Sequence, residues 1–326
     1  MKDSNVNLSR RKVLAGIAAT VAAGMAPHIL ADPKIKSRVV RVESDRVWKG
    51  EKRDPKVVQE MVHSGLIELT DKKTLEAAWK SIFNPDMKVG LKINLLGNPS
   101  IYTAPEITAV VAAGAVAAGV KPDNIIIWDR YKDHFLQTEY KLGKHESGGT
   151  VCAGGEYDAE RLVNTIKSQA RMDKLASQAT QITINLPVLK DHICAGVTAS
   201  LKNIAFGCYK HPELAHENFC DPYIVDAYEH YIKYNKVPLI IMDATQACYE
   251  GCPRPTNPSY RWKENAIYLA VDPVAMDQIA MQRIMLKRRE MEMSDKSIMS
   301  VHISTAAERG LGTNKPDMID FTTIRI

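Results

Sequence analysis

Length, composition and charge place the chain among ordinary globular proteins. The sequence has 326 residues, of which 45% are hydrophobic and 25% charged, and its formal net charge is +5. No basic stripe with interleaved aromatic residues occurs, so we expect no nucleic-acid partner. Beyond the N-terminal region, no segment reaches the about 20 apolar residues that a membrane-spanning helix needs, so we expect no stable membrane span.

The first residues have the pattern of an export signal. Paired arginines, Arg10 and Arg11, precede an apolar run over residues 13–25 and a possible signal-peptide cleavage site at residues 29–31. This order predicts a twin-arginine signal peptide over residues 1–31, with the twin-arginine translocation machinery as a partner and a periplasmic or other extracytoplasmic location. A buried N-terminal helix and a retained membrane anchor are the alternatives.

Residues 32–326 are interpreted as one domain with insertions. They contain no linker, low-complexity tract or fixed-period repeat, and their number is near the upper limit for one hydrophobic core. Two tightly joined lobes are the alternative. Short apolar runs alternate with longer amphipathic ones, which predicts an α/β fold with a mainly parallel sheet flanked by helices.

The predicted elements follow in chain order. They are strands Val39–Val42 and Val89–Leu95, helix Pro105–Ala118, strand Asn124–Trp128, helix Tyr157–Ser177, strand Gln181–Asn185, helix Pro222–Tyr234, strands Leu239–Met242 and Ala266–Ala270, and helices Pro273–Arg288 and Ile303–Arg309. Asp272 is the expected cap of the helix that Pro273 opens, and Gly310 is the expected stop after the last helix. The glycines around Cys152 predict an irregular, flexible insertion.

Polar residues follow several of the predicted strands. In an open parallel sheet the carboxyl ends of the strands share one edge, where ligands bind. We therefore predict a cleft there whose catalytic candidates are Lys92, Asp129, Lys190, His192, Asp243 and Asp272, with Asn94 as a binding residue. The alternative is that the aspartates cap helices and end strands. Lys92 is harder to explain structurally, because a lysine within an apolar strand needs a partner or a task.

The segment Gly196–Phe206 is predicted to be a loop that enters a short helix. Thr198, Ser200, Lys202 and Asn203 could present polar groups to an anion at the helix N-terminus, whereas the alternative is an ordinary amphipathic helix. His216 could reach the cleft from a loop or be a surface histidine. The stretch from His211 to His216 does not fit a zinc-protease motif, because the spacing is wrong and Pro212 interrupts it.

Five of the six cysteines lie in the second half of the chain. They are Cys194, Cys208, Cys220, Cys248 and Cys252. We predict a metal or iron–sulfur site built from Cys248, Cys252 and one or two of the others, with disulfides or inert thiols as alternatives. No Cys-x2-Cys motif, phosphate-binding loop, Gly-x-Gly-x-x-Gly fingerprint or nucleophile elbow occurs.

Several segments together resemble one family. They are Lys92–Leu95, Thr103–Glu106, Asn185–His192, Gly196–Asn203, Asp243–Ala244 and Asp272–Asp277. In this order they are similar to the domain-of-unknown-function family numbered 362, over about residues 38–285. The resemblance carries over to Lys190, His192, Lys202, Asn203, Asp272 and Asp277. It implies the fold and the cleft but no reaction. Some members are fused to ferredoxin-like segments, but this chain lacks the closely spaced cysteines of such a module.

Three functions follow from these features. The first is an exported enzyme acting on a small anionic substrate, such as an organic acid, with or without a metal. In this enzyme Lys92, Lys190 and Lys202 would hold a carboxylate or phosphate. His192, with Asp243 or Asp272 as its partner, would move a proton. The second is a metal- or iron–sulfur-binding redox protein with a redox partner. The third is a non-catalytic assembly or binding factor for an exported redox complex, for which the aromatic segment Tyr223–Tyr234 would supply an apolar patch.

Overall fold

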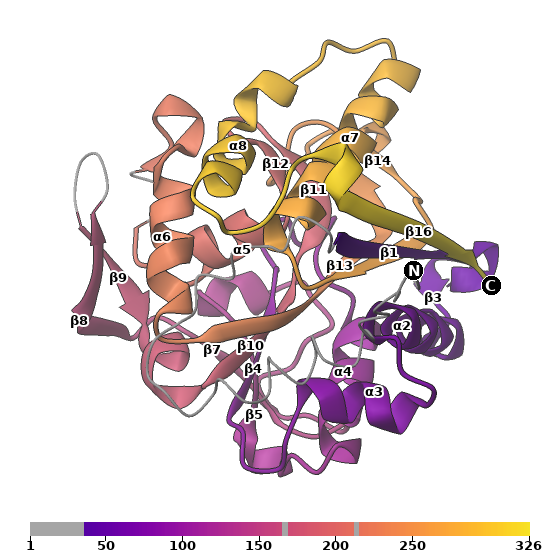
Figure 1. The fold of residues 1–326 in the computed structure, drawn as a ribbon, viewed down its shortest axis with the longest axis vertical. Helices are drawn as coiled ribbons and strands as arrows, with labels where there is room; N and C mark the ends of the chain where they lie inside the picture. Colours follow the sequence, from indigo (N-terminus) through magenta and orange to yellow (C-terminus); the bar gives the residue numbers. More distant parts are fainter. Residues whose placement is uncertain (1–35, 165–168, 212–214) are drawn as a thin grey trace, which may run out of the picture. The chain divides into compact units, whose positions relative to one another are not determined.

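A twelve-stranded mixed sheet organises the part of the chain that the structure describes (Figure 1). The structure is a computed structural model that describes residues 36–164, 169–211 and 215–326, so the predicted signal peptide lies outside the described residues. The principal strand order is β16-β1-β15-β13-β10-β4-β5-β7-β6. Among the described residues, no helix combines the length and the hydropathy needed to cross a membrane.

The strands have the following bounds. They are β1 Ser37–Glu43, β2 Trp48–Lys49, β3 Lys52–Arg53, β4 Val89–Ile93, β5 Ile125–Asp129, β6 Gly143–Lys144, β7 Thr150–Ala153, β8 Tyr157–Asn164, β9 Gln169–Asp173, β10 Ile182–Leu186, β11 Val188–His192, β12 Gly196–Thr198, β13 Lys236–Cys248, β14 Arg261–Trp262, β15 Ala266–Ala270 and β16 Ile319–Arg325.

The helices have the following bounds. They are α2 Pro55–Thr70, α3 Leu75–Ile82, α4 Pro105–Ala117, α5 Ser200–Gly207, α6 Tyr223–Ile232, α7 Pro273–Glu290 and α8 Val301–Glu308. Helix α4 begins with Pro105 in its first turn, as predicted, and Asp272 caps α7 by accepting hydrogen bonds from Val274 N and Ala275 N, both at 2.9 Å.

The centre of the sheet is parallel. Strand β10 pairs in parallel with both β4 and β13, and β5 pairs in parallel with both β4 and β7. Strand β15 pairs antiparallel with β13, and β1 pairs antiparallel with β15. The carboxyl ends of β4, β5 and β10 therefore meet at one edge, whereas β15 ends at the opposite edge. The predicted α/β class with a mainly parallel sheet flanked by helices is confirmed.

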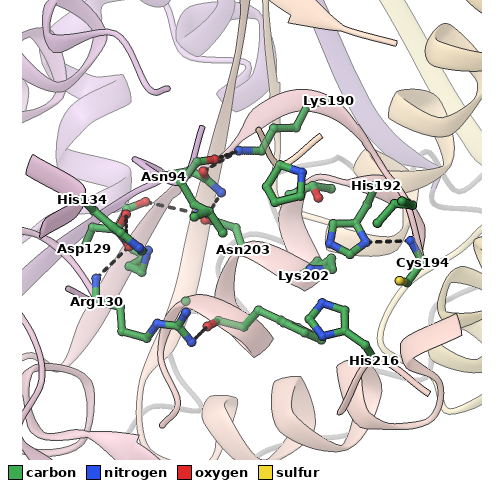
Figure 2. A pocket seen from close by; sticks show the side chains of 17 residues that line it. Asn94, Asp129, Arg130, His134, Lys190, His192, Cys194, Lys202, Asn203 and His216 are labelled. Carbon is green, nitrogen blue, oxygen red and sulfur yellow. Dashed lines mark hydrogen bonds and ion pairs between the residues drawn. The ribbon is translucent and has the colours of Figure 1, made fainter. Parts of the chain in front are cut away.

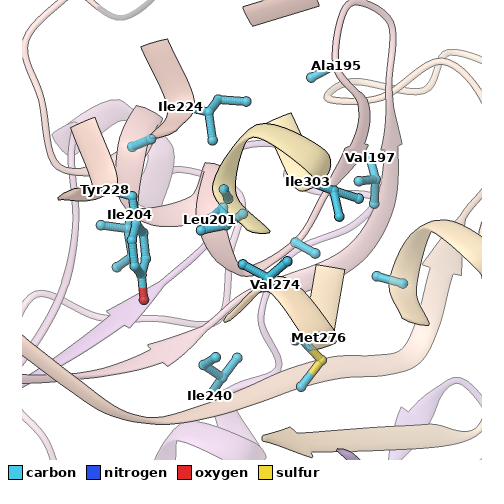
Figure 3. Packing of buried hydrophobic residues seen from close by; sticks show 14 of the residues in the cluster. Ala195, Val197, Leu201, Ile204, Ile224, Tyr228, Ile240, Val274, Met276 and Ile303 are labelled. Atoms are coloured by element: carbon cyan, nitrogen blue, oxygen red, sulfur yellow. The ribbon is translucent and has the colours of Figure 1, made fainter. Parts of the chain in front are cut away.

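Helices cover both faces of this sheet because its strands are apolar on both sides. In β13, Leu239 and Ile241 join the hydrophobic cluster that includes α2, α3 and α4, whereas Ile240 and Met242 join the cluster that includes α5, α6, α7 and α8. This alternation follows from the two-residue period of a strand. Figure 3 shows side chains of the second cluster, among them Leu201 of α5, Val274 of α7, Ile240 of β13 and Ile303 of α8.

Two sequence-based expectations are wrong. Within the predicted helix 157–177, the described residues form the antiparallel strands β8 and β9 and the start of a short π-helical turn at Leu175–Ala179. Asp158 accepts a hydrogen bond from Glu160 N, and Asp173 accepts one from Leu175 N, so both carboxylates stabilise local non-helical backbone. Cys152, expected in an irregular insertion, lies in β7, where it pairs with Trp128 of the parallel strand β5.

The aromatic segment 223–234 is mostly core. Tyr223, Tyr228 and Tyr231 of α6 are buried, and only Ile232, Lys233 and Tyr234 at the end of the segment are exposed. The expected apolar docking patch is therefore absent from this helix. The sequence also failed to indicate α2 and α3, whose apolar residues pack on the first cluster.

The N-terminus of α5 is held by a buried carboxylate from another helix. Asp277 of α7 accepts hydrogen bonds from Ser200 N at 2.6 Å and Leu201 N at 3.2 Å. These amides are therefore already satisfied. The expectation that they bind a substrate anion at the start of this helix is wrong, because the Asp277 carboxylate occupies that position.

We predict that Asp277→Ala lowers the free energy of unfolding by about 1–3 kcal/mol, because it leaves buried amides of α5 without an acceptor. Urea unfolding followed by circular dichroism measures the change. Asp123→Ala, at an exposed site, is the control and should stay within about 0.5 kcal/mol of the unmodified protein. Equal stability of Asp277→Ala and the control would contradict the assigned role.

Candidate functional site

A cavity of about 430 Å³ lies where β4, β5 and β11 end and α5 begins. This volume is within the range of about 300–1,000 Å³ that small-molecule sites occupy. Figure 2 shows side chains from these elements converging on one space. The lining residues are Lys92, Asn94, Leu96, Asp129, Arg130, His134, Lys190, His192, Ile193, Cys194, Thr198, Lys202, Asn203, Phe206, Gly207, His216 and Pro253.

A buried ion pair joins two neighbouring strands at the floor of this cavity. Lys92 Nζ of β4 donates to Asp129 Oδ1 of β5 at 2.8 Å and also to the Ile93 carbonyl oxygen at 2.5 Å. Gly207 packs against this ammonium, since a Cβ added there would lie 2.8 Å from Lys92 Nζ. The structure thus gives the lysine inside the apolar strand its partner.

Asp129 organises the ends of β4 and β5. Its carboxylate also accepts hydrogen bonds from Leu95 N and Arg130 N, both at 2.8 Å, and contacts His134 Nδ1 at 3.4 Å. Burial by itself raises the pKa of Asp129, but the Lys92 ammonium and His134 hold this pKa well below its usual value. Asp129 is therefore ionised and fully occupied by protein groups.

An amide network connects the ion pair to β10 and β11. Asn94 Nδ2 donates to Asn203 Oδ1 at 2.9 Å, and Asn203 Nδ2 donates to Asn185 Oδ1 at 2.7 Å. Asn94 Oδ1 accepts from Lys190 Nζ at 2.8 Å. Each hydrogen bond of this network has a defined donor. The network therefore fixes which end of each asparagine amide is the oxygen and which is the nitrogen.

Two further cations border the cavity. Lys190 Nζ also donates to the Leu96 carbonyl oxygen, and burial lowers the pKa of Lys190. Arg130 Nη1 donates to the carbonyl oxygens of Phe206 and Tyr209, at 2.9 and 3.2 Å. Arg130 Nε has no hydrogen-bond partner within the described residues. Both side chains add positive charge that the protein leaves partly unmatched.

Lys202 differs from the other lysines of the cavity. Its ammonium lies 3.7 Å from the centre of the Phe206 ring, and no hydrogen-bond acceptor or ion-pair partner contacts it in residues 36–164, 169–211 and 215–326. Burial, together with the charges of Lys190 and Arg130, lowers the pKa of Lys202 to about 7. Near neutral pH this side chain can therefore release or accept a proton.

The hydrogen bonds of His192 define its tautomer. Its Nδ1 accepts hydrogen bonds from Cys194 N at 3.1 Å and Ala195 N at 3.2 Å, so in the neutral ring Nε2 carries the proton. Burial and the Lys202 ammonium lower the pKa of His192, which keeps the ring neutral. The ring stacks on His216, with centroids 5.4 Å apart. His192 is thus a neutral hydrogen-bond donor at the cavity.

The cysteines separate into two possible ligand groups. His192, His216 and Cys220 form one, and Asp191, Cys248 and Cys252 form the other. Each group contains at most two cysteines, so the expected third or fourth cysteine beside Cys248 and Cys252 is missing among the described residues. The first group is a poor metal site, because the amides of Cys194 and Ala195 already use His192 Nδ1, and Nε2 carries the ring proton.

The remaining predicted metal residues belong to neither group. Cys194 lines the cavity. Cys208 is buried at the end of α5, and burial raises the pKa of its thiol. All six cysteines are free thiols.

Two predicted catalytic aspartates lie away from the cavity lining. Asp243, within β13, accepts a hydrogen bond from Ala104 N at 2.9 Å, just before α4. Asp272 follows the antiparallel strand β15, so it lies at the other edge of the sheet and caps α7. The prediction that they share a cleft with His192 is wrong. For Asp272 it assumed that every strand runs parallel. Asp243 lies on a parallel stretch of β13, but its carboxylate is held by the amides of Ala104 and Thr245. Ser200 is also outside the lining, since it bonds Asn185.

The structure adds lining residues that the sequence analysis did not select. Arg130 and His134 follow β5 directly, so the same strand-end argument that selected Asp129 could have found them. Phe206 and Pro253 carried no such signal, because apolar residues line cavities and cores alike. Thr198 lines the cavity as predicted, and its hydroxyl has no partner within the described part of the chain.

We predict that Asp129→Asn lowers the free energy of unfolding at pH 7 by about 3–5 kcal/mol, because it leaves the Lys92 charge buried without compensation. The folded-state pKa of Asp129 lies below its unfolded value of about 3.9, so the contribution of the pair is complete above about pH 4 and is lost as the pH falls further. The deficit of the variant should therefore shrink below pH 4.

Urea unfolding between pH 3 and pH 7 measures this deficit. Asp133→Asn, an exposed aspartate four residues along the chain, is the matched control and should show no pH-dependent difference from the unmodified protein. A deficit for Asp129→Asn that stays constant over this range would argue against an ionised Asp129 paired with Lys92.

Comparison with known proteins identifies a family. No curated protein matches the chain significantly. A solved structure, the lactate racemase apoprotein from Thermoanaerobacterium thermosaccharolyticum, aligns at 13% identity with a TM-score of 0.44, covering 78% of this chain and only 58% of that chain. The model of the family described as a domain of unknown function, DUF362, matches residues 89–282, more than half of the sequence. The chain therefore belongs to the DUF362 family.

Proposed function

We propose that the protein is an enzyme that binds a small organic anion in the cavity and moves a proton on it. Four cationic side chains line the cavity, namely Lys92, Arg130, Lys190 and Lys202, against one carboxylate, Asp129, which Lys92 already neutralises. An excess of partly buried positive charge favours a carboxylate or phosphate as ligand. The apolar side chains of Leu96, Ile193, Phe206 and Pro253 complete the lining, as in most small-molecule sites.

The state of Lys202 carries the proposal. Lys92 and Lys190 each donate to protein oxygens, whereas Lys202 borders the cavity without an acceptor among the described residues. A buried lysine of this kind serves well as a general base, since burial destabilises its charged form. The Asp277 cap and the Asn203 network hold α5, and with it Lys202, in place.

His192 supplies the complementary group. Its Nε2–H donates a hydrogen bond, and its neutral state lets it stabilise a developing oxyanion without first losing a proton. Lys190, on the same strand two residues earlier, faces the same cavity and adds positive charge.

The proposed reaction is proton abstraction from a carbon next to a carboxylate or carbonyl group. The neutral Lys202 amine takes the proton, the electron pair of the C–H bond moves into the adjacent carbonyl, and the resulting oxyanion accepts the His192 hydrogen bond. Return of the proton from the Lys202 ammonium to the same or another carbon gives an epimer or an isomer. A positioned general base contributes about 10²–10⁴-fold to such a step.

We predict that Lys202→Met abolishes deuterium incorporation into the substrate and that kcat/KM of the unmodified protein rises with pH through about 7 and then levels. The value of kcat/KM rises with pH because Lys202 acts as a base only in its neutral form, and burial lowers the pKa of Lys202 to about 7 in the free protein. Proton NMR in D2O over a panel of small carboxylates with a neighbouring C–H bond measures the exchange.

Lys121→Met, which removes an exposed lysine, is the matched control and should keep full exchange. His192→Gln, which keeps a side-chain N–H donor, should retain more activity than His192→Ala. Unchanged exchange in Lys202→Met would contradict the assignment of the base, and a kcat/KM that falls between pH 6 and pH 8 would contradict its protonation state.

We also propose that the chain is exported folded by the twin-arginine route, on the support of Arg10, Arg11 and the apolar run that follows them. Cell fractionation of the full chain tests this proposal. The unmodified protein should appear in the periplasm, and the double variant Arg10→Lys, Arg11→Lys should stay in the cytoplasm, because the paired arginines are the mark of the route. Equal export of both forms would contradict it.

A further inference from the structure

A second cluster of ligating side chains lies on the other side of β11 from the cavity. Lys190 and His192 line the cavity, and Asp191 between them points to the opposite face, as the two-residue period of a strand requires. Strand β11 pairs with the end of β13, where Lys190 is opposite Cys248. Cys252 follows four residues later, next to Pro253 of the cavity lining.

The three side chains are buried and close together. Asp191, Cys248 and Cys252 have exposed fractions of 0%, 0% and 1%. One carboxylate oxygen and the two sulfur atoms all lie within 4.8 Å of one another. The Cys252 amide donates to Asp191 Oδ1 at 3.0 Å, and Cys248 Sγ lies 3.9 Å from the same oxygen.

One ligand atom of the cluster is unused. Asp191 Oδ2 is inaccessible and has no hydrogen-bond partner within the described residues. Its nearest recorded cation is Lys296 Nζ, at 3.9 Å, beyond hydrogen-bond distance. Glu250, which attracts the same ammonium, bonds Lys296 more closely at 2.7 Å. A buried carboxylate oxygen without a hydrogen-bond donor is rare in folded proteins. Asp191 Oδ2 is therefore available to bind a cation.

We propose that Asp191, Cys248 and Cys252 bind a divalent metal ion of the zinc class. Two thiolates and a carboxylate form a donor set that suits Zn²⁺, and bonds of about 2.0–2.3 Å place tetrahedral ligand atoms about 3.3–3.8 Å apart. The three ligand atoms lie within 4.8 Å of one another, so metal binding would draw them closer together. The carbonyl oxygen of Glu250, 3.1 Å from Cys248 Sγ, offers a further oxygen donor beside the cluster.

The charge balance around the cluster favours this occupant. Two thiolates and one carboxylate carry three negative charges, and a divalent cation leaves one, which the Lys296 ammonium faces at 3.9 Å from Asp191 Oδ2. Metal binding would release the thiol protons to solvent, so affinity should rise with pH. The cluster is distinct from His192, His216 and Cys220, where backbone amides already use the Nδ1 lone pair.

The proposed ion would fix two borders of the cavity from behind. Asp191 lies between Lys190 and His192, and Cys252 precedes Pro253. A metal bridging them ties β11 to the segment after β13 and so restricts the positions of the Lys190 ammonium and the His192 ring. This site does not depend on the proposed proton transfer, since its ligands do not touch the substrate.

Cobalt binding to the full-length protein tests the site. The protein is reduced, stripped with a chelator and titrated with Co²⁺ without air. We expect one Co²⁺ per chain, with a near-ultraviolet thiolate-to-cobalt absorption band that Zn²⁺ displaces. Cys248→Ser and Cys252→Ser should lose the band, and Asp191→Asn, which keeps an acceptor for the Cys252 amide, should weaken binding at least tenfold.

Cys152→Ser and Cys220→Ser are the matched controls and should keep the band. If the variants at Asp191, Cys248 or Cys252 do not fold, the unmodified protein still decides, because bound Zn²⁺ should protect Cys248 and Cys252, but not Cys152, from alkylation. Absence of the band in reduced unmodified protein overturns the proposal. So does a band lost in Cys220→Ser, or a Cys248–Cys252 disulfide whose reduction yields no cobalt binding.

Discussion

The buried contact between the Lys92 ammonium and the Asp129 carboxylate is the interaction on which the cavity depends. Removing two charges from water is unfavourable unless geometry and further hydrogen bonds compensate, and here Asp129 also binds the amides that follow β4 and β5. The pair therefore joins the ends of two parallel strands at the edge where ligands bind. Gly207 allows the ammonium to approach α5, so the same contact sets the position of the helix that carries Lys202.

From this floor outward, the cationic groups become progressively less satisfied. Lys92 is fully paired, Lys190 donates to Asn94 and a carbonyl oxygen, and Lys202 has only an aromatic ring beside it among the described residues. A cavity in which the Lys202 ammonium has no anion beside it in the described part of the chain is a site that an anionic ligand completes. The neutral His192 ring also lines this cavity. A bound ligand would therefore meet both a base, Lys202, and a hydrogen-bond donor, His192, which is what proton transfer requires.

Much of this arrangement could be predicted from the sequence, because strand periodicity and strand-end polarity are local signals. Lys92, Asn94, Asp129, Lys190 and His192 were selected in this way, whereas Lys202, Asn203 and His216 were selected from the loops and short helix that follow; all line the cavity. Asp272 was misplaced because strand direction depends on tertiary pairing, and β15 runs antiparallel. Asp243 lies on a parallel stretch of β13, but its carboxylate binds the amides of Ala104 and Thr245, a tertiary contact that no local signal shows. Asp191 was passed over because Cys248 and Cys252, which complete its cluster, lie 57 and 61 residues away in sequence.

The most direct test of the account is the ionisation of Lys202 in the folded protein. Carbon-13 NMR of the lysine Cε resonances, with Lys202 assigned by its loss in Lys202→Met, follows this titration residue by residue. The account predicts a Lys202 pKa of about 7 in the free protein, rising when a small carboxylate saturates the cavity. A Lys202 that titrates near the ordinary lysine value of about 10.4, with or without a carboxylate, would contradict it.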